Sequence, residues 1–234
     1  MSRVKEFLKT SKYTKGIVYF GIELNNNLHQ KKRDLITRVR IKKSGIKLID
    51  TIQKILKKYC VFFFFDMGTL LGIVREGCII KHDLDIDIAV RVDSEAEKEN
   101  IKNILSSIGA VECCRYKVDE LGVVEQSYIY KDVKFDINYY VTKGDKDYCY
   151  LMYRDPDKEY SIDEMSVVEL SCSHIENIAL HKFSRISVNV PENAEAYLSD
   201  RYGENWRIPD KKYVYWRGPS TSLTDYVGKR IGSL

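Results

Sequence analysis

Hydrophobic periodicity divides the first half of the chain into helices and a buried strand. Between Ile46 and Tyr59, apolar residues recur at three- and four-residue steps, which predicts a helix with one buried face. The continuous apolar run at 61–65 is too short for a helix and predicts a buried strand. A polar helix is expected over 94–108, because Ser94 suits an N-cap and acidic residues follow it in the first turn.

Two further stretches alternate between apolar and polar residues, which predicts strands with two different faces. The first covers 83–88 and would present three carboxylates on one face and three aliphatic side chains on the other. Its carboxylates are Asp83, Asp85 and Asp87. The second covers 133–141 and would place Asp136 on its polar face.

The last third of the chain contains all four prolines and is expected to be rich in loops rather than a separate domain. Strands at 178–183 and 186–190 are predicted to form a hairpin. A short helix is then expected over 191–198, with Pro191 in its first turn.

The strand with three aspartates indicates a metal site. Carboxylates two residues apart on a strand lie about 7 Å from each other and repel by about 2 kcal/mol at an effective dielectric constant of ~20. A divalent cation reverses the sign of this interaction, and hard carboxylate oxygens suit Mg²⁺ or Mn²⁺. The alternative is a solvated strand face that is acidic by chance.

The Gly68-Thr69 pair, which precedes the aspartate strand by a short loop, indicates a phosphate site. A turn of this kind that opens a helix presents free backbone N–H groups, and these suit a phosphate. An isolated Gly-Thr is more simply explained as an ordinary turn. Together with the aspartate strand, however, the pair resembles the nucleotidyltransferase fold, in which the two elements surround one polyphosphate.

Two longer strings carry a more specific resemblance. The chain reads GTLLGIVREGCIIKHDLDIDIAV over 68–90, and YLSDRYGENW over 197–206 is followed by Pro209. These strings resemble the LicD family, to which the fukutin and fukutin-related transferases belong. The family carries GTLLG, an Arg and an acidic run ending in D-x-D, and it closes with Y-L, Y-G, W and P. The resemblance extends over about 46–209, and the chain departs from the family at His82, where a Trp and a denser acidic run are usual.

The resemblance implies an α+β fold, with a nucleotidyltransferase-like mixed β-sheet and flanking helices. It also implies a third carboxylate from a neighbouring strand, here Asp136, as a metal ligand or general base. Asp85, Asp87 and Asp136 are then expected to hold two Mg²⁺ or Mn²⁺ ions. The implied reaction moves phosphocholine, ribitol phosphate or glycerol phosphate from a CDP-alcohol donor to a glycan hydroxyl and releases CMP.

Four further residues are predicted to hold the donor or the acceptor. Gly68 and Thr69, with nearby backbone N–H groups, would bind phosphate oxygens. Arg75 would pair with one phosphate, and its alternative is a salt bridge to the acidic strand. Asp83 would orient the acceptor or support the second ion. The closing motif is expected to serve packing, with Gly203 as the C-cap of its helix.

Charge is distributed unevenly along the 234 residues. The first 59 residues hold 16 Lys and Arg against 4 Asp and Glu, a net charge of +12. The remainder holds 22 basic and 30 acidic residues, a net charge of −8. These values predict a basic helical arm, 1–43, and an acidic catalytic domain, 44–234, which needs metal to accept a phosphate ester.

The basic arm indicates a polyanionic partner. A helix lying on an anionic membrane would have this composition, and a solvated helix packed on the domain explains it equally well. Nucleic acid is the weakest alternative, because no recognised RNA-binding motif accompanies the arm. No signal peptide or membrane-spanning segment is evident, and the six cysteines lack C-x-x-C spacing, so we expect free thiols. These features predict a cytoplasmic enzyme, peripheral on the inner face of a membrane.

Two other functions remain open from the sequence. A true nucleotidyltransferase would move a nucleoside monophosphate from a triphosphate and release pyrophosphate, using the same D-x-D strand. A catalytically silent protein would use the basic arm to dock at a membrane or a polymerase complex. The intact Asp85, Asp87 and Asp136 argue against the silent protein, because their mutual repulsion would have no purpose there.

Overall fold

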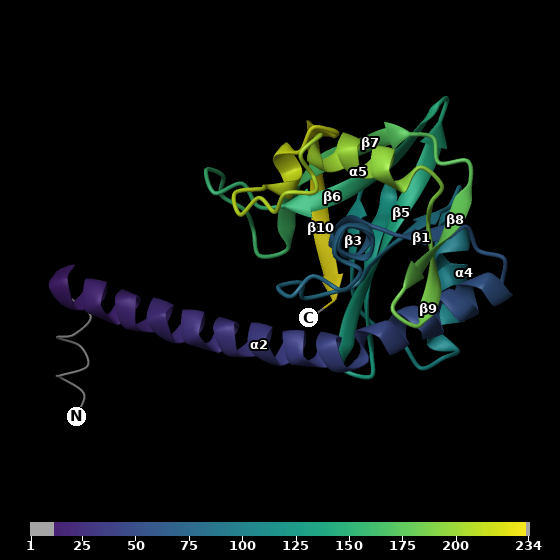
Figure 1. The fold of residues 1–234 in the computed structure, drawn as a ribbon. Coiled ribbons are helices and arrows are strands. Elements are labelled where there is room, and N and C mark those ends of the chain that lie inside the picture. The colour runs from purple at the N-terminus through teal and green to yellow at the C-terminus, as the bar shows by residue number, and fades with distance from the viewer. Residues whose placement is uncertain (1–11, 233–234) are drawn as a thin grey trace.

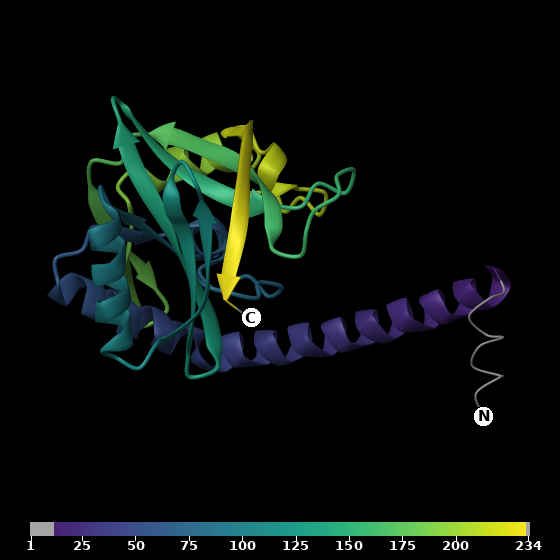
Figure 2. The ribbon, with the colours of Figure 1, turned by 180° about the vertical axis from the view of Figure 1, so that it is seen from behind.

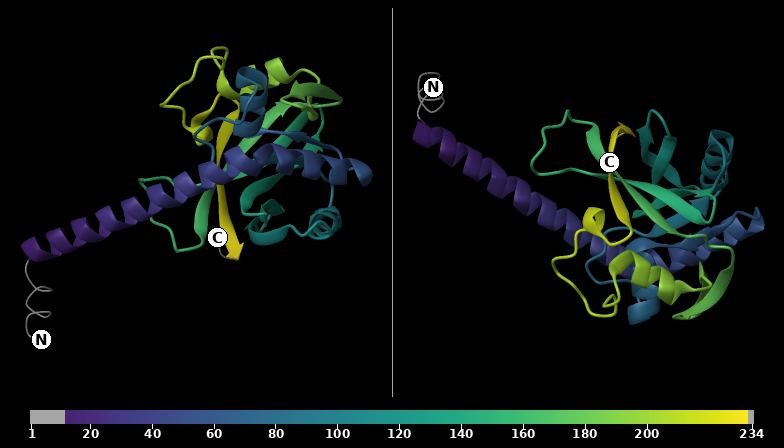
Figure 3. Two further views of the ribbon diagram at one scale, coloured as in Figure 1. Left: turned by 60° about the horizontal axis from the view of Figure 1, so that its bottom comes forward. Right: turned by 90° about the horizontal axis from the view of Figure 1, so that it is seen from above.

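The basic arm and the helix predicted at 46–59 form one continuous helix, α2 (Lys12–Lys58), in the computed structural model, which describes residues 12–232. Its 47 residues extend about 70 Å at 1.5 Å per residue. The N-terminal half of α2 projects away from the rest of the chain, and the C-terminal part packs on the sheet (Figure 1, Figure 3). The boundary expected between residues 43 and 44 falls inside this helix. The start of the predicted arm lies outside the described residues.

Eight strands form one mixed sheet in the described part of the chain, in the order β1-β2-β5-β4-β3-β10-β7-β6. β2 runs parallel to β5, and the other neighbouring strands are antiparallel. The α+β class predicted from the sequence is thereby confirmed. The strands are β1 (Phe63–Phe65), β2 (Asp87–Arg91), β3 (Val111–Val118), β4 (Gly122–Tyr130), β5 (Val133–Lys143), β6 (Lys146–Tyr153), β7 (Glu164–Ser173) and β10 (Thr221–Gly232).

A pairing between β5 and β6 closes six of these strands into a ring. One edge of β5 serves two partners in succession, because β2 pairs with 136–140 and β6 pairs with 141–143. Side chains of the ring pack together as a second apolar cluster, separate from the main core. This cluster comprises Cys114, Tyr116, Val118, Val124, Tyr150, Met152 and Val167.

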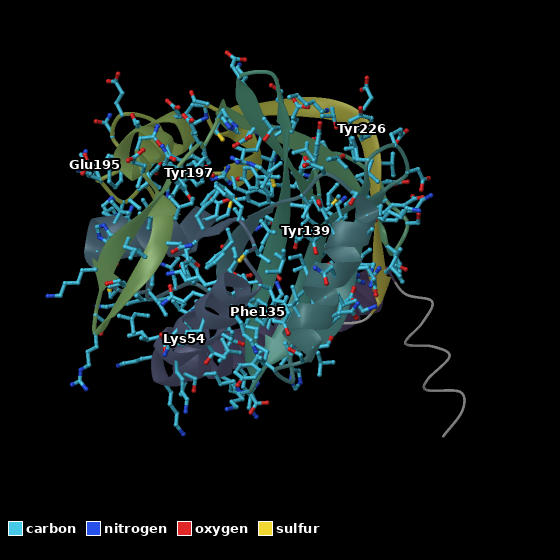
Figure 4. The ribbon with its side chains drawn as sticks, turned by 90° about the vertical axis from the view of Figure 1, so that its right-hand side faces the viewer. Lys54, Phe135, Tyr139, Glu195, Tyr197 and Tyr226 are labelled. Atoms are coloured by element: carbon cyan, nitrogen blue, oxygen red, sulfur yellow. The ribbon has the colours of Figure 1, made fainter. Side chains whose placement is uncertain are left out.

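The main core lies between the sheet and the helices α2 and α4 (Glu95–Ser106). Phe135 and Tyr139, which are labelled in Figure 4, lie on the face of β5 that these helices cover. Lys54 points outward from α2 into solvent in the same view. The predicted start of α4 is confirmed, because the Ser94 hydroxyl accepts a hydrogen bond from the backbone N–H of Glu97 at 3.3 Å.

The predicted hairpin is confirmed as β8 (Ile178–Phe183) and β9 (Ile186–Pro191), which form a small separate sheet. β9 packs beside β1, where the Asn189 amide donates to the Phe63 carbonyl at 3.2 Å. The helix expected over 191–198 begins later, because Pro191 is the last residue of β9 and pairs with Ile178. The helix is α5 (Ala194–Tyr202), and the prediction that proline opens it is wrong.

Two other predictions need correction. The strand expected over 83–88 begins only at Asp87, because its partner β1 ends where Phe65 pairs with Ile88 and the chain then turns into a helix. Asp83 and Asp85 therefore precede the strand. The C-terminal part is also less loop-rich than expected, since β10 is a twelve-residue strand between β3 and β7 (Figure 2).

Candidate active site

A cavity of about 470 Å³ opens over the start of β2 and the middle of β5. Acidic side chains come to it from β2, β4 and β5, apolar ones from β6 and β7, and a basic one from α5. The residues that line it are Met67, Gly68, Asp85, Asp87, Tyr116, Glu125, Asp136, Asn138, Leu151, Met152, Met165, Arg201, Tyr202 and Tyr215. Four of the residues predicted from the sequence therefore meet here: Gly68, Asp85, Asp87 and Asp136.

The three aspartates converge because two parallel strands are in register. Asp87, the first residue of β2, is the direct partner of Asp136 on β5. The Lys134 ammonium, two residues before Asp136 on the same face of β5, links Asp136 to Asp85. Its Nζ lies 2.6 Å from Asp136 Oδ2 and 3.3 Å from Asp85 Oδ2. Asp136 is buried, with 5% of its surface exposed.

A fourth carboxyl group, that of Glu125, lines this cavity. Glu125 of β4 is the register partner of Asn138 of β5. The strand β5 lies between β4 and β2, which carries Asp87. Burial, with a smaller effect of the nearby Asp136 charge, raises the pKa of Glu125 to about 8. Burial likewise raises the pKa of Asp87 well above its ordinary value, and the nearby Asp85 and Asp136 act in the same direction. The raised pKa values of Glu125 and Asp87 mean that this wall, with Lys134 as its ammonium group, has too little positive charge to keep all of its carboxyl groups ionised.

The donor atoms of this wall suit a hard divalent cation. Asp136 Oδ1 is a buried acceptor that has no hydrogen-bond partner, and Asp85 and Asp87 supply further carboxylate oxygens on the same cavity. In the described part of the chain, however, no group of three or more His, Cys, Asp or Glu side chains is already arranged around a metal position. Lys134 instead provides the positive charge between Asp85 and Asp136.

The GTLLG motif forms the short helix α3 (Met67–Leu71), which follows β1 directly. Thr69 is buried and its hydroxyl accepts the backbone N–H of Asp87 at 2.9 Å, so it fixes the start of β2. Gly68 borders the cavity, and a Cβ at this position would lie 3.1 Å from Asp83 Oδ2. Gly68 is therefore needed for close approach of the Asp83 loop, and Thr69 lies behind the cavity wall.

Gly72, the last glycine of the motif, has a similar steric role. It begins a π-helical turn, η1 (Gly72–Glu76), and a Cβ there would lie 2.6 Å from the Cys78 carbonyl oxygen. Arg75 in this turn donates to Glu76 Oε1 at 2.7 Å and to the Trp206 carbonyl at 3.3 Å. It lines a neighbouring cavity of about 530 Å³ rather than the acidic one.

Asp83 also lies outside the cavity lining, beside Gly68. Burial, together with the negative charges of Asp85 and Glu76, raises its pKa to about 7. Its Oδ2 is buried without a hydrogen-bond partner. The roles predicted for Asp83, Thr69 and Arg75 in substrate binding remain predictions, and the structure places all three behind or beside the cavity.

A buried hydrogen-bond network that sequence reasoning missed lies below the cavity. Asp66, which is fully buried at the N-cap of α3, accepts the hydroxyls of Tyr140 and Tyr197, each at 2.7 Å. The two tyrosines come from β5 and α5, so the network joins the closing motif to the sheet. Tyr197 is labelled in Figure 4 and, like Trp206, is almost fully buried. Gly203 ends α5 with φ +88°, as predicted for a C-cap.

Glu125, Lys134, Asn138 and Arg201 are the cavity residues and neighbours that sequence reasoning did not assign to the site. Lys134 and Asn138 could have been identified from the sequence, because residues two positions from Asp136 on a strand share its face. Glu125 and Arg201 could not, because only the pairing of β4 with β5 and the packing of α5 bring them here.

Comparison with known proteins bears on these predictions. The sequence profile described as LicD/FKTN/FKRP, nucleotidyltransferase domain, matches residues 61–193. The chain belongs to the LicD family. The resemblance of the GTLLG and D-x-D strings to this family is thus confirmed, and the matched range contains the three aspartates of the cavity.

Two curated relatives of this LicD-family chain are named ribitol-5-phosphate transferase FKTN, one from Homo sapiens and one from Macaca fascicularis. Each is 24% identical over 213 residues, covering 89% of this chain and 41% of the relative. The chain therefore spans less than half the length of these relatives. A crystal structure of ANT(2")-Ia in complex with adenylyl-2"-tobramycin aligns with 43% of this chain and 52% of its own, at 14% identity and a TM-score of 0.34.

Two further features of the described residues are the state of the cysteines and the composition of the helices. All six cysteines are free thiols, as expected from their spacing. None of the helices in residues 12–232 combines the length and the apolar composition needed to cross a membrane.

Proposed function

We propose that this chain is a metal-dependent transferase that moves a phospho-alcohol group from a CDP-activated donor to a hydroxyl of a glycan and releases CMP. The observation that carries the proposal is the convergence of Asp85, Asp87 and Asp136 on one cavity of a LicD-family chain. The name of the two relatives supports ribitol phosphate as the transferred group, with glycerol phosphate and phosphocholine as alternatives.

Asp85, Asp87 and Asp136 would hold one or two Mg²⁺ or Mn²⁺ ions, which supply positive charge against the donor diphosphate. The acceptor hydroxyl oxygen attacks the phosphorus that carries the alcohol. The bond from this phosphorus to the bridging oxygen of CMP breaks, and CMP leaves with the bond electrons. Asp136 is the candidate base that takes the hydroxyl proton, and the Lys134 ammonium at 2.6 Å orients its carboxylate.

The experiment that tests this proposal is product release from a panel of nucleotides. Purified protein with Mg²⁺ or Mn²⁺ is given CDP-ribitol, CDP-glycerol, CDP-choline, CTP or ATP, with and without a glycan acceptor. We expect CMP from one CDP-alcohol, and a fall of at least about 100-fold in the Asp85→Asn, Asp87→Asn double variant, since removal of a group that acts in the transition state costs this much. Asp225→Asn, an exposed residue of β10, is the matched control and should retain the activity.

Two results would contradict the transferase. Pyrophosphate released from CTP or ATP would identify a nucleotidyltransferase, the function that shares the D-x-D arrangement. No product from any nucleotide in the presence of acceptor, with no change in melting temperature on adding Mn²⁺ and a CDP compound, would indicate the silent binding protein.

We also propose that the enzyme acts at the inner face of a membrane, on a glycan or lipid-linked glycan, with α2 as the contact. The described part of α2 exposes Leu28, Leu35 and Val39 at seven- and four-residue spacing, which places them on one side of the helix. Lys32 lies on the same side of the helix, between Leu28 and Leu35, and Arg38 lies at the edge of this stripe. An apolar stripe with a basic border supports an anionic lipid surface as the partner.

A further inference from the structure

Arg201 is a buried cation in which two of the three guanidinium nitrogens make no hydrogen bond. Only 3% of its surface is exposed, although it lines the acidic cavity. Its Nε and Nη1 atoms are buried and make no hydrogen bond, and Nη2 contacts the sulfur of Met67. A buried donor without a partner costs free energy, and a buried charge without a partner costs more. Such an arrangement is typical of a group held ready for a ligand.

A buried carboxylate, Asp66, favours the charged form of Arg201 but makes no hydrogen bond to it. Asp66 is the buried carboxylate of the network below the cavity, and its two oxygens accept the hydroxyls of Tyr140 and Tyr197. Asp66 could accept further hydrogen bonds, but none comes from the Arg201 guanidinium. Tyr202, whose ring lies 5.7 Å from the guanidinium carbon, limits its movement on the α5 side.

A second unpartnered donor faces the same space. Asn138 of β5 is 2% exposed, lines the cavity and has a buried Nδ2 without a hydrogen-bond partner. It follows Asp136 on the same face of the strand, so its amide lies beside the carboxylates. The cavity thus combines carboxylate oxygens for a cation with guanidinium and amide donors for an anion. A diphosphate that carries a divalent ion has both of these charges.

We propose that Arg201 and Asn138 form the subsite that binds the phosphoryl oxygens of the nucleotide diphosphate donor. This inference rests on the proposed function and assigns the phosphate contacts that Thr69 and Arg75 were predicted to make. Thr69 is used by the backbone of Asp87, and Arg75 is used by Glu76 and Trp206. Arg201 lies beyond residues 61–193, the range that the family profile matches.

The test measures the binding of inorganic pyrophosphate and of CDP by isothermal titration calorimetry, with and without Mn²⁺. Wild-type protein is compared with Arg201→Met, which keeps the volume and removes the charge, and with Arg201→Lys. We expect Arg201→Met to bind both probes about ten- to a hundredfold more weakly, the effect of losing hydrogen bonds to a charged group. Arg201→Lys should show an intermediate loss, because an ammonium replaces only part of the guanidinium donor set.

The control is Arg207→Met, which makes the same charge change at an exposed arginine paired with Glu195. It should bind both probes as the wild type does. Melting temperature without ligand separates binding from structure. Because Arg201→Met also removes a positive charge near the buried Asp66, its melting temperature shows whether the variant is folded under the conditions of the titration.

Unchanged binding of pyrophosphate and CDP by Arg201→Met would overturn the inference. If Arg201→Met fails to fold, Arg201→Lys and Asn138→Leu decide: weaker binding by both supports the subsite, and wild-type binding by both overturns it. The proposed function fails separately. If pyrophosphate binding depends on Arg201 but the wild type releases no CMP, the subsite is supported and the transferase activity is rejected. If the wild type releases CMP but Arg201→Met binds pyrophosphate and CDP as the wild type does, the transferase activity is supported and the subsite is rejected.

Discussion

At the scale of single residues, Lys134 determines how the acidic wall of the cavity is held together. Its ammonium lies 2.6 Å from Asp136 and 3.3 Å from Asp85, and nearly three quarters of its side chain is buried. Burial opposes the charged form of Lys134, but Asp136 and Asp85 outweigh it and raise the pKa of Lys134 above its ordinary value, so the ammonium is charged at neutral pH. A divalent ion and Lys134 are therefore two alternative sources of positive charge for the same carboxylates.

The variant Lys134→Met tests whether a divalent ion and the Lys134 ammonium compete for Asp85 and Asp136. Without metal, its free energy of unfolding should fall by about 2 kcal/mol, because Asp85 and Asp136 lose their compensating charge. Mn²⁺ should then raise the melting temperature of the variant more than that of the wild type. Thermal denaturation in EDTA and in Mn²⁺ measures both effects, with Lys117→Met on the exposed side of β3 as control. An equal Mn²⁺ response in variant and wild type would show that Lys134 does not compete with the ion.

At the scale of elements, α2 has different surroundings along its length. Leu48, Ile49, Ile52 and Leu56 are buried against the sheet, and residues 28–40 expose apolar side chains instead. The apolar pattern changes along one uninterrupted helix, so the boundary between arm and domain is a change in what the helix contacts. The exposed stripe is the feature that a membrane surface would cover.

We expect the protein to sediment with vesicles that contain anionic phospholipid at low salt, and to be released as salt screens the basic side chains. Leu35→Glu combined with Val39→Glu should reduce the bound fraction at least about tenfold, since each buried apolar side chain contributes roughly 1.5–3 kcal/mol. Ile162→Glu, at a position 80% exposed on the body, is the control. Equal sedimentation of the Leu35, Val39 variant and the wild type would exclude the stripe as the contact.

At the scale of the whole molecule, Asp147 joins the elements that close the ring. Its side chain is 1% exposed. Asp147 lies on β6 at the point along the edge of β5 where the pairing with β2 ends and the pairing with β6 begins. Its carboxylate receives hydrogen bonds from Arg91 of β2 at 2.8 Å, Thr142 of β5 at 2.7 Å and the backbone N–H of Ile175 at 2.9 Å. These hydrogen bonds hold the pKa of Asp147 below its ordinary value, although burial opposes them.

The lowered pKa predicts a pH dependence with a definite sign. A carboxyl whose pKa is lower in the folded state stabilises the protein above its unfolded pKa of about 4, and this contribution is lost as the pH falls through the folded value. Asp147→Asn should lower the free energy of unfolding by about 2–3 kcal/mol at pH 7, because it leaves the Arg91 charge unpaired. The difference between wild type and variant should narrow below pH 4. Urea denaturation at pH 7, 5 and 3.5 measures it, and a difference that stays constant with pH would contradict this account.

Local patterns in the sequence determined the helices at 46–58 and 95–106, the hairpin β8–β9, the alternation of β5 and the family membership. Each of these depends on residues close in the chain: a periodic apolar face, a Ser94 cap, or a compact motif such as GTLLG. The same patterns named Asp85, Asp87 and Asp136, since a carboxylate on a strand face is visible from the residues two positions away.

Only the tertiary structure decided how these pieces share one cavity. The parallel register that puts Asp87 beside Asp136, the closure of β6 onto β5 and the insertion of β10 all depend on strand pairings between distant residues, which leave no local pattern. Thr69 illustrates the difference, because its place in a phosphate-like turn is readable in the sequence, and its hydroxyl is taken by Asp87 only after folding. Arg201 illustrates the converse: in the sequence it is one of 38 basic residues, and burial beside four carboxylates is what separates it from the others.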